Sequence, residues 1–488
     1  MGLFDFNLSK NANKPSSNSD SDLKQLVNAI DTWLKSQKRQ EMLVSKDYFE
    51  GKHDILNRKR MVMNEVGTLS PVENLPNNRL VDNQFKKLVE QKTNYALGKP
   101  MTIATSDDKY LEQLTKIFDK KMFRQLRLLG EEAISGGIAW LYPYYNSNGE
   151  FKVKVFPAHE VMPIWTDNSH TELEKGVRIY ADSIINADGK VENVTVVEVY
   201  TTDGIDKYIK RGEHINPHPT EPHLNYMKQD DQEFNWQRLP LIPFKYNSKE
   251  IPLIRNVKSL QDSLNQVLSD FQNNMEEDPR TTILVLKNYD GTNIPEFRRN
   301  LATYGVVKVH TVDGVQGGVD TLKVEVNAQN YQAILMQLKR AIVENGRGFD
   351  AKEERMDGDP NQMNIESMYT DIDLDVNQME TEFQAGFEEL KWFIDQHLVH
   401  IGAGDFSEQK VEFIFNRDIF INENAMIDNC VKSVGILSQK TIVARHPWTA
   451  DLQHELNQLE EDKQAELEEM EQMQAFQKPV NGGGSNAD

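Results

Sequence analysis

The chain has 488 residues, of which 38% are hydrophobic and 27% charged, and its 55 Lys and Arg against 76 Asp and Glu give a net charge of -21. This length exceeds one small core and predicts roughly two to four structural regions, whereas no apolar run reaches the ~18 to 20 residues that cross a bilayer. The acidic balance disfavours tight binding of duplex DNA, which depends on cations that neutralise phosphates. It leaves open both a protein that does not contact DNA and a conduit with acidic walls in which DNA slides.

The N-terminal segment shows no recognisable targeting signal. Phe6 stands where a myristoylation signal needs Ser or Thr, and a basic segment followed by an apolar one is missing, so we expect no export. Residues 1–22 are rich in Asn, Ser, Lys and Asp, which predicts a disordered tail. The only cysteine, Cys430, excludes an intrachain disulfide and a cysteine-based metal site, fits a reducing cytoplasm, and is interpreted as a small buried hydrophobe.

Helices and then strands follow this tail. Helical spacing of apolar residues starts near Leu23, and a second helix is predicted for residues 80–97, with its end at Gly98-Lys99-Pro100. Between residues 101 and 247, short β-prone runs alternate with turn signals, which indicates an α+β region. These runs are Ile138 to Tyr145, Phe151 to Phe156, Gly176 to Tyr180, Val194 to Thr201 and Leu241 to Tyr246.

Two amphipathic helices flank a compact insert. Residues 254–278 and 327–345 repeat apolar positions at helical spacing, and the first helix stops at Asp278-Pro279. The apolar positions are Ile254, Val257, Leu260, Leu264, Val267, Leu268, Phe271 and Met275 in the first helix and Tyr331, Ile334, Leu335, Leu338 and Ile342 in the second. In the insert, strands are predicted at 281–287, 306–310 and 321–326 and a helix at 295–304. We expect the two helices to pair antiparallel, with the insert at their tip.

The remainder of the chain is mostly helical. A polar segment with glycines at 345–361 predicts a mobile loop, and a long helix is predicted at about 375–400. A strand at 411–415 and helices at 423–437 and 450–477 are predicted to follow. Residues 451–477 hold nine acidic residues against Lys463 alone, which favours a solvated helix, with a coiled coil or a partner-facing helix as alternatives.

Several local segments carry a family resemblance. They are Tyr48 to Leu56 (YFEGKHDIL), Asn78 to Asn83 (NRLVDN), Asn94 to Pro100 (NYALGKP), Pro157 to Ile164 (PAHEVMPI) and Ile283 to Gly291 (ILVLKNYDG). None is a catalytic signature, and the specificity lies in their number and order. In these segments the chain resembles the portal proteins of siphoviruses that infect Gram-positive bacteria, over about residues 40 to 425.

The resemblance implies an α+β, portal-type subunit with an α+β wing, a two-helix stem, a small α/β clip and a helical crown. Between flexible tails at 1–22 and 478–488, the implied regions are a wing at 23–253 and 363–425, a stem at 254–278 and 327–345, a clip at 279–326, a tunnel loop at 346–362 and a crown at 426–477.

The resemblance also implies a function. Such subunits form a homo-oligomeric ring, typically a dodecamer, at one capsid vertex, where the ring nucleates the procapsid and is the channel for packaging and ejection of double-stranded DNA. The implied partners are a terminase and later a neck adaptor at the clip, together with the scaffold protein and the major capsid protein. The ring is assembled in the host cytoplasm and stays in the virion, without membrane or cofactor. The alternative is a structural scaffold or head-assembly protein without a DNA role.

Catalytic motifs are missing from the sequence. Lys52, Lys99 and Lys190 follow glycine but precede His, Pro and Val, so no Walker A loop is present, and neither a Gly-x-Ser-x-Gly elbow nor a His-Glu-x-x-His helix occurs. We therefore expect a protein that is not an enzyme and any packaging motor to be a separate protein.

The cations of the tunnel-loop segment are the candidate DNA contacts. Arg347, Lys352 and Arg355 stand among acidic residues, and local sequence alone favours an ordinary surface loop. The family resemblance instead favours weak contacts with successive phosphates that do not read bases. Lys339 and Arg340 are further candidates, although favourable charges at a helix C-terminus explain them nearly as well.

Metal sites are only weakly indicated. Asp371, Asp373, Asp375 and Glu382 occupy positions one, three, five and twelve of a calcium-loop template, but Val376 replaces its glycine, so acids at a helix N-terminus are the favoured interpretation. A nuclease that uses Asp371 is a weak further alternative.

Histidine and tryptophan positions do not add a site. His214, His218 and His223 lie irregularly spaced in a proline-rich segment and are interpreted as solvated loop residues. The tryptophans are scattered and favour core or interface anchors over a base-stacking platform. They are Trp33, Trp140, Trp165, Trp236, Trp392 and Trp448.

Overall fold

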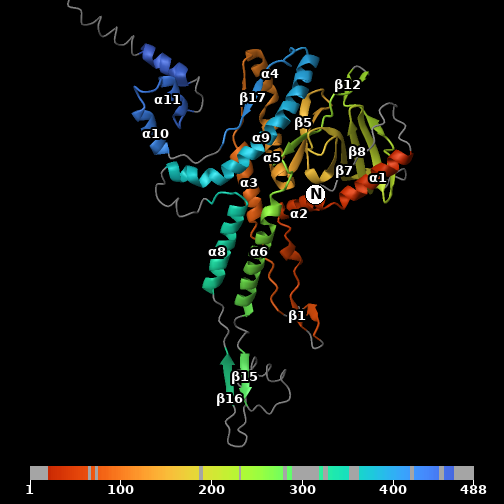
Figure 1. Cartoon of the computed structure of the whole chain (residues 1–488), viewed down its shortest axis with the longest axis vertical. Coiled ribbons are helices and arrows are strands. Elements are labelled where there is room, and N and C mark those ends of the chain that lie inside the picture. The colour runs from red at the N-terminus through yellow and green to blue at the C-terminus, as the bar shows by residue number, and fades with distance from the viewer. Residues whose placement is uncertain are drawn as a thin grey trace, which may run out of the picture. The chain divides into compact units, whose positions relative to one another are not determined.

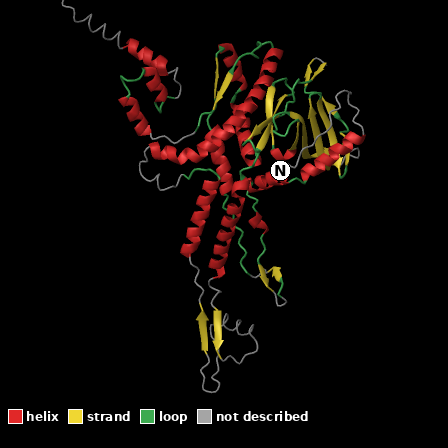
Figure 2. Ribbon diagram, viewed as in Figure 1, coloured by secondary structure: helices red, strands yellow, loops and turns green. Residues whose placement is uncertain are grey.

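The computed structural model describes residues 20–63, 67–71, 75–185, 191–229, 232–277, 283–287, 318–322, 328–350, 362–417, 423–449 and 455–465. The chain divides into two compact units, one of residues 1–349 with 371–418 and the other of residues 350–370 with 419–488. Helices and antiparallel sheets are mixed, which confirms the predicted α+β class (Figures 1 and 2). None of the helices in the described ranges is long and apolar enough to span a membrane.

The first elements are α1 (Asp20–Leu34), α2 (Gln37–Phe49), the 3-10 helix η1 (Asp54–Asn57), the hairpin β1 (Met61–Met63) and β2 (Leu69–Pro71), and α3 (Gln84–Leu97). The predicted start of α3 at residue 80 is wrong. Asn83 caps the helix through a bond from the backbone N–H of Lys86, so the residues before it stay extended. The predicted end before Gly98 is confirmed.

Two sheets follow in the α+β region. The smaller one has strand order β14–β4–β5, from β4 (Ile138–Tyr145), β5 (Phe151–Phe156) and β14 (Ile242–Lys245). The larger one has order β10–β9–β8–β7–β6, from β6 (Val161–Trp165), β7 (Leu173–Ile185), β8 (Val191–Thr201), β9 (Gly204–Arg211) and β10 (His214–Pro217), and β11 (His223–Leu224) also pairs with β9. A small hairpin joins β12 (Met227–Gln229) to β13 (Gln232–Phe234).

The main core lies where helices cover the smaller sheet. It includes α4 (Asp108–Ile117), α5 (Lys120–Gly136), the short 3-10 helix η2 (Ala158–Glu160), and α9 (Gln362–His400). Phe383 and Phe387 of α9 pack edge-on against Phe244 of β14, and Gly386 fits between them because a Cβ there would lie 2.7 Å from the Phe244 ring. β17 (Val411–Ile414) returns to pair with β3 (Thr102–Thr105). The predicted start of α9 near residue 375 is wrong, because the helix begins 13 residues earlier (375 - 362 = 13), at Gln362.

The predicted helix pair is confirmed as α6 (Ile254–Glu277) and α8 (Ala328–Asn345), which lie side by side (Figure 1). They run antiparallel: Phe271 near the end of α6 meets Tyr331 near the start of α8, with ring centroids 5.0 Å apart. Of the insert, β15 (Ile283–Lys287) pairs antiparallel with β16 (Gly318–Leu322). The second strand therefore starts three residues before the predicted 321. The helix at 295–304 and the strand at 306–310 lie outside the described residues.

The second unit holds short helices. They are α10 (Glu423–Lys432), α11 (Gln439–Arg445) and a helical stretch at 455–465. The helix predicted to run to residue 437 ends at Lys432, and Gly435 has φ 86, a left-handed conformation that favours glycine. Ser438 then caps α11, which was not predicted. Cys430 is 8% exposed, so its interpretation as a buried residue is confirmed.

Candidate functional site

The helix α6 has an apolar face toward α8. Leu264 is fully buried, while Leu260 and the α8 residues Leu335 and Leu338 are partly buried against the same core. Near the other end of the pair, Nδ2 of Asn274 donates to the Tyr331 hydroxyl at 2.8 Å. This face is the predicted amphipathic stripe.

A second, polar face of α6 is also buried. Gln261, Asn265, Ser269 and Asn273 occur at every fourth position, and each is at most 1% exposed. We call these four residues the polar ladder. Their side-chain oxygens accept hydrogen bonds from backbone N–H groups of an extended segment, residues 78–83, and of the first residues of α3. The bonds are Asn78 to Asn273 at 2.7 Å, Leu80 to Ser269 at 2.9 Å, Asp82 to Asn265 at 3.0 Å, Gln84 to Gln261 at 3.0 Å and Phe85 to Gln261 at 3.1 Å.

The hydrogen bonds of the polar ladder form in register because the four-residue repeat of the helix and the two-residue repeat of the extended segment are nearly equal in length. Four helical residues advance about 6 Å, and two extended residues advance about 6.6 Å. Every second N–H of the segment therefore meets the next ladder residue. Backbone donors that another strand satisfies in a sheet are here satisfied by side chains of a helix. These residues were not predicted from the sequence, although uncharged polar residues at strict four-residue spacing beside an apolar stripe are a recognisable signal.

The segment Tyr48 to Leu56 binds the same helix. The Tyr48 hydroxyl donates to Asp262, and Nδ2 of Asn265 donates to Nδ1 of His53 at 2.8 Å. The other ring nitrogen of His53 donates to the Tyr48 carbonyl at 3.1 Å, and burial lowers the pKa of His53, which keeps the imidazole neutral. Lys258 adds ion pairs with Asp54 at 2.6 Å and Asp262 at 2.7 Å. Two of the segments that carry the resemblance thus converge on one face of α6.

The described start of the segment that was predicted as the tunnel loop is held against α3. Gln91 of α3 makes two hydrogen bonds with the backbone of Phe349, and Lys92 donates to the Arg347 carbonyl at 3.0 Å. Lys92 also pairs with Asp375 of α9 at 2.5 Å, and the Tyr246 hydroxyl bonds to the same carboxylate. This part of the loop is therefore held by α3, and Asp375 of α9 and Tyr246 in turn hold Lys92.

The candidate DNA-contact cations have different surroundings. Nζ of Lys339 lies 2.7 Å from Asp82, and Nε of Arg340 lies 2.8 Å from Glu344. The Arg347 guanidinium is 55% exposed and 3.9 Å from Asp375. Lys352 and Arg355 lie outside the described residues.

The acidic candidates for calcium lie on the continuous helix α9 instead of a loop, and they are interior to it, so both the calcium-loop template and their placement at a helix N-terminus are wrong. Asp373 binds the Tyr95 hydroxyl at 2.6 Å and pairs with Arg417, and Asp375 pairs with Lys92. These acids therefore have tertiary partners. Asp371 is exposed and Glu382 half-buried. Across the described ranges, no group of three or more His, Cys, Asp or Glu is arranged to hold a metal ion.

The histidines and tryptophans have structural surroundings. His214 lies on β10 and is exposed, His218 accepts from the Glu221 N–H at 3.2 Å, and His223 pairs with Asp206 at 2.7 Å. Most of the tryptophans are buried or half-buried, whereas Trp448 is 71% exposed. No stacking platform is formed by those on the main core.

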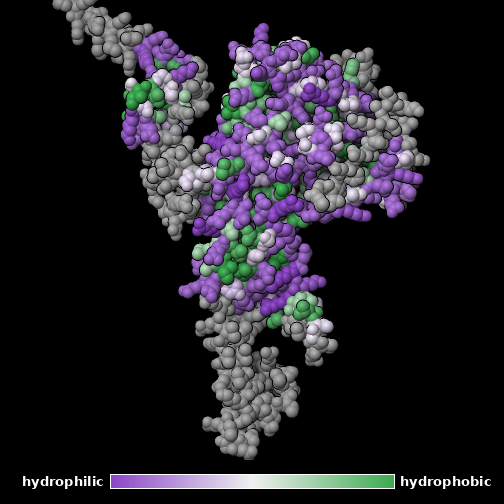
Figure 3. Space-filling view, in the orientation of Figure 1, coloured by the Kyte–Doolittle hydropathy of each residue, from purple (hydrophilic) through white to green (hydrophobic). Residues whose placement is uncertain are grey.

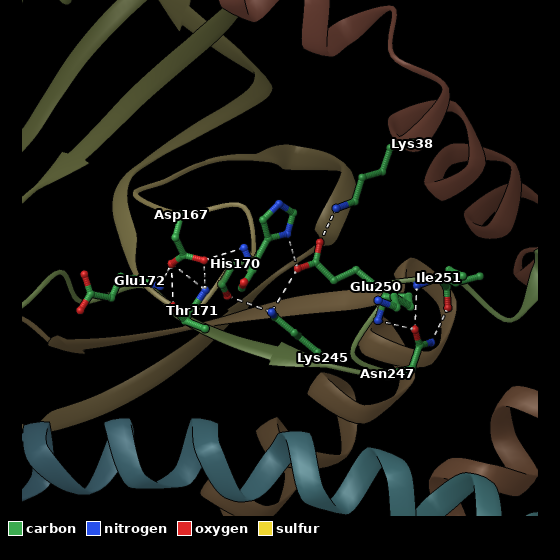
Figure 4. Close-up of polar contacts among 11 residues, drawn as sticks. Lys38, Asp167, His170, Thr171, Glu172, Lys245, Asn247, Glu250 and Ile251 are labelled. Atoms are coloured by element: carbon green, nitrogen blue, oxygen red, sulfur yellow. Dashed lines mark hydrogen bonds and ion pairs between the residues drawn. The ribbon is translucent and has the colours of Figure 1, made fainter. Parts of the chain in front are cut away.

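The junction between the sheets and α6 is a charged cluster of Lys38, His170, Lys245 and Glu250, which we call the junction cluster (Figure 4). The Glu250 carboxylate is bound by Lys38, by Nδ1 of His170 at 2.8 Å and by Lys245 at 3.2 Å. Burial alone raises the pKa of Glu250, but the His170 hydrogen bond and the Lys38 charge outweigh it and hold the pKa well below its usual range.

Two residues of the junction cluster, Glu250 and His170, have strained backbone conformations. Glu250 has φ 53 and His170 has φ 57, in a region that non-glycine residues rarely adopt. Asp167 holds the turn of His170 by accepting from the Thr171 hydroxyl at 2.6 Å and the Glu172 N–H at 3.0 Å. Such strain persists only where the surroundings over-determine it, so the cluster fixes the direction in which the chain enters α6.

Comparison with known proteins covers nearly the whole chain. The family described as "Phage portal protein, SPP1 Gp6-like" matches residues 34–469. The portal protein of Bacillus phage SPP1 is 29% identical over 420 residues, which are 85% of this chain and 82% of that protein. The portal protein of Clostridium phage phiCD119 is 29% identical over 439 residues, 87% of this chain and 93% of that protein. The resemblance found in the local segments is confirmed.

Proposed function

The chain belongs to the SPP1 Gp6-like family of phage portal proteins, and we propose that it forms a ring at one capsid vertex through which double-stranded DNA is packaged and ejected. The observation that carries this proposal is the α6–α8 pair. Its first helix, α6, is braced by the buried polar ladder, and its second, α8, is followed by a charged loop with a fixed base. A channel wall needs this rigidity, because DNA exerts force on it without being bound tightly.

The family membership supports an assignment of regions. We assign the wing to residues 23–253 and 363–425, the stem to 254–278 and 327–345, and the clip to 279–326. The tunnel loop is then 346–362 and the crown 426–477, between tails at 1–22 and 478–488. In this assignment the polar ladder joins the wing to the stem, since residues 78–85 belong to the first and α6 to the second.

The charge balance supports guidance of DNA without a firm grip. A net charge of -21 keeps the binding of DNA phosphates weak. The cations Arg347, Lys352 and Arg355 of the tunnel loop supply weak contacts that do not read bases. Lys339 and Arg340 each face a carboxylate of their own subunit, which leaves less of their charge for phosphates.

The wider role follows from the family as a proposal. The ring has no enzymatic activity of its own and binds no cofactor. The clip docks the terminase and later the neck adaptor, while the scaffold protein and the major capsid protein place the ring in the procapsid, assembled in the host cytoplasm.

Electron microscopy of the purified protein tests the ring. Closed rings with a central hole are expected, whereas filaments or compact monomers would support a scaffold without a DNA role. Deletion of residues 346–362 then tests the loop: rings stay intact and DNA packaging in phage falls. Loss of rings on this deletion would identify the loop as a subunit interface instead of a channel element.

A further inference from the structure

The turn that opens the tunnel loop rests on one face of α3. Leu88, Gln91 and Lys92 are spaced three and four residues apart, so their side chains lie on the same side of the helix. All three contact the turn at residues 346–349. We call this turn the loop base.

Gln91 binds the loop base as a neighbouring strand does. Its Oε1 accepts from the Phe349 N–H at 2.9 Å, and its Nε2 donates to the Phe349 carbonyl at 2.6 Å. Both backbone groups of Phe349 are thereby satisfied by one side chain. Phe349 itself lies beyond the end of α8 at Asn345.

The ammonium group of Lys92 is buried and binds the backbone carbonyl of Arg347, two residues before Phe349. The Lys92 side chain is fully buried, and its Nζ lies 3.0 Å from the Arg347 oxygen and 2.5 Å from Oδ2 of Asp375. Burial lowers the pKa of Lys92, and the Asp375 charge opposes that effect. A buried cation needs such partners, so the loop base supplies part of the solvation of Lys92.

The loop base is also shaped for close approach to Leu88. A Cβ on Gly346 or Gly348 would lie 2.5 or 2.3 Å from the Leu88 methyl groups. Between these glycines, Arg347 has φ 48, an uncommon conformation for a residue with a side chain. The hydrogen bonds from α3 hold this conformation.

We propose that Gln91 and Lys92 are positioning residues of the tunnel loop, which fix its first turn identically in every subunit. The proposal rests on the proposed function, in which the loop meets DNA. Weak phosphate contacts act together only when the subunits present their cations in register. A rigid base supplies this register, starting with the exposed guanidinium of Arg347.

Hydrogen exchange in intact rings tests the positioning. In Gln91→Ala the Phe349 amide loses its acceptor and is expected to exchange about tenfold faster or more. Gln91→Glu keeps the acceptor for this amide but loses the donor to the Phe349 carbonyl, so its protection is expected to be intermediate. The control is Lys87→Met, on the exposed side of the same helix, which is expected to change nothing. Unchanged exchange at Phe349 in Gln91→Ala overturns the proposal.

The role of Lys92 is tested in a double variant that leaves neither charge of the Lys92–Asp375 pair unpaired. Lys92→Met combined with Asp375→Leu removes both charges of the pair, and it is expected to accelerate exchange across residues 346–349 while rings still form. Retention of the wild-type exchange rates in such rings overturns the role of Lys92.

Phage carrying these substitutions separate the two claims. Gln91→Ala is expected to lower DNA packaging toward the level of the loop deletion, with Gln91→Glu intermediate. If the deletion impairs packaging and Gln91→Ala does not, the positioning proposal is wrong. If even the deletion packages normally, the DNA role of the loop is wrong, whatever the exchange data show.

Discussion

At the scale of single residues, the Asn265 side chain of the polar ladder binds three partners, Asp82, Gln261 and His53. It is fully buried, its Oδ1 accepts from the Asp82 N–H and from Nε2 of Gln261, and its Nδ2 donates to His53. Asn265→Ala leaves these buried groups unpaired, so we expect a loss of about 1 to 3 kcal/mol in the free energy of unfolding.

Chemical denaturation measures this loss, with Gln266→Ala as the control. Gln266 neighbours Asn265 on α6 but is exposed, so its substitution is expected to stay within about 0.5 kcal/mol of the wild type. Equal effects of the two substitutions would show that the ladder bonds add nothing to stability.

Glu250 leads to a prediction about how the stability of the fold depends on pH. Its folded pKa lies below its unfolded value of about 4.3, so its contribution is present above that pH and is lost as pH falls through the folded pKa. Glu250→Gln leaves Lys38 and Lys245 without their carboxylate and is expected to cost roughly 3 kcal/mol at pH 7.

Thermal unfolding of both proteins from pH 7 down to pH 3 checks this prediction. The difference in midpoint between wild type and Glu250→Gln should be constant near neutrality and shrink below pH 4.3. Glu112→Gln removes an exposed carboxylate from a surface pair and is the control that should change little. A difference that stays constant down to pH 3 would contradict the proposed ionisation.

At the scale of elements, the hydrogen bonds of the extended segment 78–83 predict that the cost of a substitution alternates from one residue to the next. The N–H groups of Asn78, Leu80 and Asp82 are bound by the ladder, and the N–H of Val81 between them is not. Leu80→Pro removes a bound N–H, so it should destabilise the chain by about 1 kcal/mol more than Val81→Pro. Val81 is the more buried side chain, so a larger cost for Val81→Pro in denaturation experiments would mean that side-chain packing, not the ladder, holds the segment.

The elements differ in how far the sequence predicts them. The bounds of α6 and α8 were predicted within one residue, because an apolar repeat and Pro279 are local signals. The start of α9 was placed too late because Asp371 and Asp373 look like residues of a helix start, whereas Asp373 is held inside the helix by Tyr95 and Arg417. Such partners are distant in sequence, so no local pattern reveals them.

The candidate site shows the same division. The charged loop was recognised from composition, but its anchoring by Gln91 and Lys92 depends on residues about 250 positions earlier. The junction cluster was missed because Glu250 and His170 are ordinary surface residue types in sequence. Only the fold places both in left-handed conformations beside one another.

At the scale of the whole molecule, a closed ring needs two different surfaces that meet between neighbouring subunits. Figure 3 shows hydrophobic residues over α6 and α8, below a largely hydrophilic surface of the proposed wing. Ile334 and Met336 of α8 are 45% and 61% exposed. On the other side of α6 in Figure 1, Met61 and Leu69 of the β1–β2 hairpin are 43% and 65% exposed.

We therefore expect the double substitution Ile334→Asn and Met336→Gln to prevent ring closure while the subunit stays folded. Size-exclusion chromatography with light scattering measures the assembly, and circular dichroism measures the fold. Val191→Thr, at a residue that is 71% exposed on β8, is the control and should assemble normally. Normal rings from the double variant would place the subunit interface elsewhere.

We expect the charge of the proposed tunnel loop to affect how DNA moves through the proposed ring. Residues 346–362 carry three cations (Arg347, Lys352, Arg355) and five acids (Asp350, Glu353, Glu354, Asp357, Asp359), a net charge of 3 - 5 = -2 per subunit. These acids weaken the attraction of the three cations for DNA phosphates. Asp357→Asn with Asp359→Asn brings the loop to neutrality, so we expect rings to retain duplex DNA more strongly and with a steeper salt dependence, and packaging to slow.

Filter binding across a salt titration measures this retention, and packaged DNA per particle measures the consequence. Glu460→Gln with Glu461→Gln makes the same charge change in the helical stretch 455–465 and is the matched control. If both pairs raise retention equally, only the total charge of the ring matters. If the loop variant binds more tightly and the control does not, the acids of the loop keep the channel from holding the DNA that it conducts.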